Sequence, residues 1–138
     1  MDDLWGELEL EDQASSDFMG ILREQAELLE IKTNFVLQAR LQKINLMSNT
    51  RGNFTMAINF NVISPRLENY TYTLFSLYFT PEIDYPVGID YKSEDFGTAA
   101  FDYFCETEDE LIECLRDLFS QRKVKSTINS LYNKSRNL

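Results

Sequence analysis

Alternation of hydrophobic and polar residues marks a β-strand in the middle of the chain. Large apolar side chains from Phe54 to Val62 alternate with Thr, Ala and Asn, the period-two pattern of a strand with one buried face. Further strands are predicted over 70–80, 87–91 and 99–105, after turns that contain Pro or Gly. Because short links join these segments, we expect a four-stranded, mainly antiparallel meander.

The strand predicted over 70–80 carries large side chains on both faces. Alternation places one apolar set inward: Phe75, Leu77 and Phe79. The opposite set is mostly aromatic: Tyr70, Tyr72, Leu74 and Tyr78. We therefore expect a central strand, or one whose outer face is occupied. Because Tyr is enriched at protein interfaces, Tyr70, Tyr72 and Tyr78 are predicted to line an outer, partner-binding face. In the last strand, Phe101 and Tyr103 are expected to point inward.

One long helix is predicted from residue 15 to about residue 45. An N-cap is offered by Ser15, Ser16 and Asp17, no Pro interrupts the segment, and apolar residues recur at spacings of three and four. They lie on more than one side of the helix, which exceeds what a small sheet can cover. Either the helix packs partly on a second subunit, giving a homodimer, or it breaks near Lys32. The homodimer is the preferred interpretation.

Two further helices are predicted after the strands. Thr107 and Glu110 form a capping box at the start of the first helix, and the second restarts at Ser120. Their apolar stripes are Leu111, Ile112, Leu115, Leu118 and Phe119, then Val124, Ile128, Leu131 and Tyr132. The element order predicts an α+β two-layer sandwich, with the two C-terminal helices packed on one face of the sheet. Residues 15–138 are expected to form a single domain.

Residues 1–14 are predicted to be an acidic, flexible tail. Six acidic residues are interspersed with Leu4, Trp5, Leu8 and Leu10, without a helical or strand pattern. One interpretation is a frayed, solvated terminus. The other is a docking motif that becomes ordered on a partner or on a sheet edge. Because Trp5 is the only Trp of the chain, we favour docking, with Trp5, Leu8 and Leu10 as partner-binding residues.

Composition narrows the class of protein. A chain of 138 residues suits one domain, and 43% hydrophobic with 13% aromatic residues excludes a disordered chain. The sequence has neither a long apolar run nor a secretory signal, so we expect a cytoplasmic protein that does not bind membranes. The net charge of −10 opposes direct binding to nucleic acid.

The charge is divided into blocks along the chain. Residues 1–30 hold ten acids and one base, residues 31–81 one acid and five bases, residues 82–117 twelve acids and two bases, and residues 118–138 five bases without an acid. Three of these bases lie at the start of the last predicted helix, where the helix dipole disfavours cations: Arg122, Lys123 and Lys125. We interpret them as partner-binding residues that contact an acidic surface.

The sequence lacks the residue types and motifs on which many catalytic sites depend. It has no His, only two Cys (Cys105 and Cys114) and no Gly-rich phosphate loop, so we predict no catalytic residue, no metal ligand and no cofactor. Five carboxylates in predicted loops and strand ends leave one enzymatic alternative, a metal-dependent hydrolase: Glu82, Asp84, Asp90, Glu94 and Asp95.

These patterns favour a non-catalytic protein-interaction module over an enzyme. The expected kinds are an immunity or antitoxin-like protein, a chaperone or an adaptor, with a protein partner that the acidic pI of about 4.4 suggests is basic. The alternatives are an acidic DNA mimic that inhibits a nucleic-acid process, and the metal-dependent hydrolase.

Overall fold

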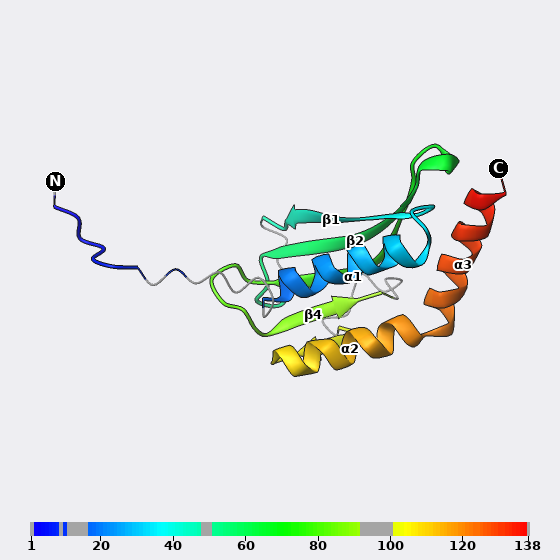
Figure 1. Cartoon of the computed structure of the whole chain (residues 1–138). Helices are drawn as coiled ribbons and strands as arrows, with labels where there is room; N and C mark the ends of the chain where they lie inside the picture. Colours follow the sequence, from blue (N-terminus) through cyan, green and yellow to red (C-terminus); the bar gives the residue numbers. More distant parts are fainter. Residues whose placement is uncertain (1, 9, 11–16, 48–50, 92–100, 138) are drawn as a thin grey trace.

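The computed structural model describes residues 2–8, 10, 17–47, 51–91 and 101–137, which form an α+β fold (Figure 1). Within them a five-stranded antiparallel sheet has the order β1-β2-β3-β4-β5. The strands are β1 Gln38–Asn45, β2 Met56–Ser64, β3 Tyr70–Phe79, β4 Val87–Asp90 and β5 Tyr103–Cys105. The helices are α1 Phe18–Lys32, α2 Glu108–Ser120 and α3 Arg122–Arg136, with a short 3-10 turn at Pro65–Leu67. The α+β class is confirmed, with one strand more than expected.

The prediction of one helix over 15–45 is wrong, and the alternative of a break near Lys32 is confirmed, because α1 ends at Lys32 and the chain turns back as β1. The Thr33 hydroxyl donates to the Leu29 carbonyl at 3.0 Å and accepts from the Leu37 N–H at 3.4 Å. Asn34 and Phe35 then adopt left-handed φ angles of 52° and 62°, a conformation that ends helices. The homodimer was expected because a long helix would have more apolar surface than the sheet could cover, and a helix of 15 residues removes that reason. The oligomeric state stays a prediction.

The left-handed turn can be tested by replacing Phe35 with glycine. The Phe35 side chain is 70% exposed, so little buried area is lost, whereas glycine adopts positive φ without strain. We expect Phe35→Gly to raise the free energy of unfolding by roughly 0.5–1 kcal/mol in chemical denaturation.

Ile31 offers the matched control, since it is also apolar and 57% exposed but lies inside α1. Ile31→Gly should lower the free energy of unfolding by about 1 kcal/mol. If Phe35→Gly is destabilising by the same amount, the chain does not turn at this position.

The first helix packs on the first strand and on the middle of the sheet. Its buried residues are Phe18, Ile21, Leu22 and Ala26. The Phe18 ring lies 5.1 Å from the Phe79 ring of β3, centroid to centroid. Towards the end of α1, the Glu30 carboxylate accepts from Arg40 Nη1 at 2.9 Å and from the Ala39 N–H at 3.3 Å. These contacts hold the helix end beside the sheet edge.

The second helix begins where the capping box predicts. The Thr107 hydroxyl accepts from the Glu110 N–H at 3.2 Å, and the Glu110 carboxylate accepts from the Glu106 N–H at 2.5 Å. Its core residues are Leu111, Leu115 and Leu118, as expected. The Phe119 ring lies 6.3 Å from the Phe60 ring and 6.0 Å from the Phe75 ring, so α2 and α1 share one face of the sheet.

The third helix turns away from α2 at Gln121, and its C-terminal part reaches Ser64 at the end of β2 (Figure 1). There the buried hydroxyls of Ser64 and Ser135 lie 2.5 Å apart, and Ser135 also donates to the Leu131 carbonyl at 2.6 Å. Arg66 donates to the Ser135 carbonyl at 3.5 Å. Because it turns away from α2, α3 covers the sheet less closely than α1 and α2 do. Its buried residues are Val124 and Ser135.

A β-bulge at Leu74 overturns the expected tyrosine face of the third strand. Phe75 lies opposite Phe60, but Thr73 lies opposite Asn61, so Leu74 is an extra residue in β3. The bulge switches the faces of the strand. Tyr70 and Tyr72 lie on the helix-bearing face, opposite Ser64 and Val62, and Tyr78 lies on the other face, opposite Ala57. The inward set Phe75, Leu77 and Phe79 is confirmed.

The other face of the sheet bears a polar ladder. Asn61 Nδ2 donates to Gln42 Oε1 at 3.1 Å, and the Thr73 hydroxyl donates to Asn61 Oδ1 at 2.8 Å. The Ser76 hydroxyl donates to Asn59 Oδ1 at 2.6 Å. These bonds satisfy side chains of three neighbouring strands, which fixes their register.

Candidate docking groove between α1 and α3

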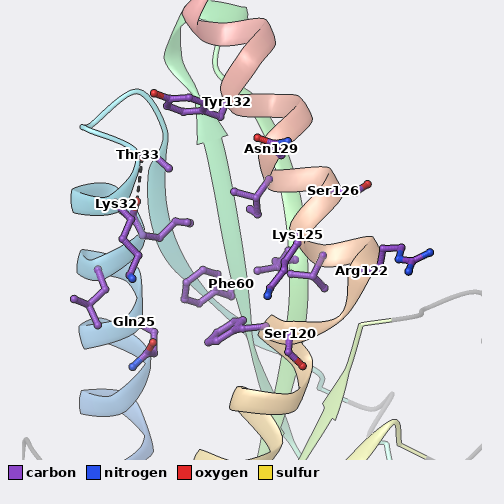
Figure 2. A pocket seen from close by; sticks show the side chains of 16 residues that line it. Gln25, Lys32, Thr33, Phe60, Ser120, Arg122, Lys125, Ser126, Asn129 and Tyr132 are labelled. Carbon is purple, nitrogen blue, oxygen red and sulfur yellow. Dashed lines mark hydrogen bonds between the residues drawn. The ribbon is translucent and has the colours of Figure 1, made fainter.

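An open groove of about 1080 Å³ separates the second half of α1 from α3 (Figure 2). It exists because α1 stops at Lys32 and α3 diverges, which leaves a strip of the sheet between them. Its base is formed by Phe60 of β2, Leu74 of the bulge and Phe119 of α2. Its walls carry further apolar side chains: Leu28 and Leu29 from α1, and Val124, Ile128 and Tyr132 from α3. Leu28 is 37% exposed, so apolar surface faces solvent here.

The charged groups among the described lining residues are all cations: Lys32, Arg122 and Lys125. The Lys125 amine points into the space between the helices, whereas the Arg122 guanidinium points outward at the rim (Figure 2). The ion pairs between described residues join Arg40 with Glu30, Arg51 with Asp90 and Arg116 with Glu113, so they involve none of these three cations. The groove thus combines apolar walls with three cations that form no ion pair with another described residue.

The structure separates the three cations predicted to bind a partner. Arg122 and Lys125 line the groove, but Lys123, on the same helix, is exposed and is not among its lining residues. All three lie in the first turns of α3, as the sequence predicts. The start of α3 has no side-chain N-cap and no acid in its first turn. The cations there are therefore close to the positive end of the helix dipole, which is electrostatically unfavourable.

This unfavourable arrangement predicts that a charge reversal stabilises the fold. Arg122 is the first residue of α3, so Arg122→Glu should raise the free energy of unfolding by about 0.3–1 kcal/mol. The control is Lys134→Glu in the last turn of the same helix, where the dipole has the opposite sign. That variant should lower the free energy of unfolding in the same denaturation assay. Equal effects at both ends would contradict a dipole origin.

The N-terminal segment offers apolar side chains to solvent. Leu4 is 91% exposed, Trp5 77%, Leu8 56% and Leu10 86%. In Figure 1 residues 2–8 lie away from the sheet and the helices. The buried core begins at Phe18 and includes none of these tail residues. The predicted partner-binding residues Trp5, Leu8 and Leu10 are therefore accessible, but the structure does not bring them to the tyrosines or to α3.

Tyr78 lies within an aromatic cluster on the face of the sheet opposite the helices. Its ring is 5.4 Å from the Phe101 ring, and the Arg51 guanidinium lies 4.2 Å from Phe101 and 5.1 Å from Tyr78. Arg51 also forms an ion pair with Asp90. A Cβ at Gly88 would lie 2.8 Å from the Phe101 ring, so glycine permits this close packing. The expectation that Phe101 points inward beside Tyr103 is wrong, and Tyr78 is partly covered.

The described carboxylates of the enzymatic alternative, Glu82, Asp84 and Asp90, do not form a metal-binding cluster. Glu82 and Asp84 are exposed, whereas Asp90 pairs with Arg51 and accepts from the Asp102 N–H at 3.3 Å. Residues 94 and 95 lie outside the described part of the chain. Within the part that is described, no three His, Cys, Asp or Glu side chains are grouped as a metal site would require.

Several thiol and phenol groups outside the groove have raised pKa values. Burial, reinforced by a hydrogen bond with Cys114, raises the pKa of the Cys105 thiol. Burial raises the pKa of Tyr85 to about 12, with the Glu108 carboxylate adding to the effect. Burial also raises the pKa of Tyr103, whose hydroxyl donates to Asp117 at 2.5 Å. These shifts favour the protonated forms, whereas a nucleophile needs a lowered pKa.

Comparison with known proteins adds no assignment, since no family model, no curated protein and no solved structure matches the chain. None of the described helices is long and apolar enough to span a membrane. The sequence pattern does not predict the groove, although it indicates the apolar positions of α3 and the cations Arg122 and Lys125. The end of α1, which forms the other wall of the groove, could have been predicted from Asn34, because Asn tolerates the left-handed conformation at a helix end.

Proposed function

We propose that the protein is a non-catalytic protein-interaction module whose docking site is the groove between α1 and α3. The observation that carries the proposal is the combination of apolar walls with Lys32, Arg122 and Lys125 in one open groove. Such a groove suits an extended or helical segment of a partner protein. Its volume of about 1080 Å³ lies just above the range for small-molecule pockets, about 300–1,000 Å³, which favours a peptide.

The chemistry of the lining indicates the kind of segment that binds. Each large apolar side chain that becomes fully buried contributes about 1.5–3 kcal/mol, so apolar anchors supply most of the affinity. The three cations favour acidic residues next to those anchors and disfavour basic ones. The acidic remainder of the surface, with twelve acids and two bases over residues 82–117, suits a second contact with a basic region. That the partner protein is basic overall stays a prediction.

The proposal is tested by selection from random peptides about 12 residues long, displayed on phage and selected on the full chain. We expect enriched peptides to combine large apolar or aromatic residues with Asp or Glu. Synthetic, fluorescently labelled copies should bind in an anisotropy titration. The Lys125→Glu variant should weaken this binding by about tenfold, because it reverses the charge that points into the groove.

Lys123→Glu is the matched control, since it makes the same change on the same helix outside the groove lining. It should leave peptide binding within about twofold of the original value. Peptides that bind Lys125→Glu as tightly as the unmodified chain, or a selection without groove-dependent peptides, would contradict the proposal.

A further inference from the structure

We infer that the groove between α1 and α3 binds the N-terminal segment, residues 2–10, of a second copy of this chain. This inference rests on the proposed function, because it uses the same groove. It names the occupant as an acidic segment with apolar anchors that the chain itself supplies.

The segment and the groove are chemically complementary. Residues 1–12 hold six acids and no base, and the charged groups among the described residues that line the groove are three cations. The apolar side chains of the segment are Leu4, Trp5, Leu8 and Leu10, of which the least exposed, Leu8, is still 56% accessible. The apolar walls of the groove can bury the apolar side chains of the segment, and the three cations can attract its acidic residues.

The position of the segment also favours a second copy. In Figure 1 it lies away from the sheet and helices of its own chain, while the groove stays open (Figure 2). The groove begins at Gln25, about two turns beyond the start of α1. A segment in this position is accessible to the groove of a second copy.

An exchange of segments between two copies is symmetric. If each of two copies inserts its segment into the other, the dimer contains two identical contacts and closes on itself. Once the first contact has formed, the second forms at a high effective concentration. A modest affinity of one segment for one groove is thus sufficient for a stable pair, and no contact between the sheets is required.

The test uses the fluorescence of Trp5, the only Trp in the sequence, together with analytical ultracentrifugation over a concentration series. We expect a monomer–dimer equilibrium in which Trp5 emission shifts to shorter wavelength as the dimer forms. Trp5→Ala should raise the dimer dissociation constant by about 30-fold, as for the removal of a central aromatic anchor. Lys125→Glu should raise it by about tenfold, and added salt should weaken the dimer.

Lys123→Glu serves again as the control and should leave the dissociation constant within about twofold. A monomer with solvent-exposed Trp5 at all concentrations would overturn the inference. A monomer in which Trp5 is already shielded would overturn it too, because the segment then occupies the groove of its own chain. A dimer that is indifferent to Trp5→Ala and Lys125→Glu would place the contact elsewhere. Each of these failures leaves the proposed function open to its own test with selected peptides.

Discussion

The reversal of the chain at Asn34 and Phe35 is the constraint on which the rest of the structure depends. Two successive residues in left-handed conformation, with Thr33 bonded both to α1 and to Leu37, end α1 and start β1. Had the helix continued, the sheet would lose its first strand, and the side chains of Leu37 and Ala39, now buried, would need other partners. Because α1 is only 15 residues long, about 22 Å at 1.5 Å per residue, it covers part of the sheet and leaves the base of the groove beside it.

The bulge in β3 and the turn at Gln121 complete this arrangement. Leu74, the extra residue of the bulge, points to the helix side and becomes part of the groove base beside Phe60. The turn at Gln121 directs α3 across the end of β2, where Ser135 is bonded to Ser64. The same turn places Arg122 and Lys125 at the groove although the helix dipole opposes cations there. Stability and charge placement are in conflict at this site, which is typical of a surface that serves binding.

The sequence predicted the elements whose patterns are local and unambiguous. The alternation from Phe54 to Val62 corresponds to β2 except at its start, since the strand begins at Met56 and Phe54 packs against Phe101 and Phe104 instead. The capping box at Thr107 and Glu110 and the apolar stripe of α3 correspond to the structure. The first helix was extended too far because its apolar residues continue without Pro, although Leu37, Ala39 and Leu41 already alternate with polar residues. The faces of β3 were wrong beyond the bulge, since one extra residue inverts the alternation. The groove depends on how α1, α3 and the sheet are placed in three dimensions, which no local pattern contains.

Our central proposal is that the face between α1 and α3 receives the acidic, apolar N-terminal segment of a second copy of this chain. A methyl-resolved NMR spectrum of the full chain, recorded over a concentration series, tests it most directly. The account predicts that methyl resonances of Leu28, Leu29 and Ile128 move as concentration rises, in the direction expected for methyl groups near an indole ring. Those of Ile44 and Ile63, whose strand positions place them on the opposite face of the sheet, should stay unchanged. Changes confined to Ile44 and Ile63, or no change at any concentration, would contradict it.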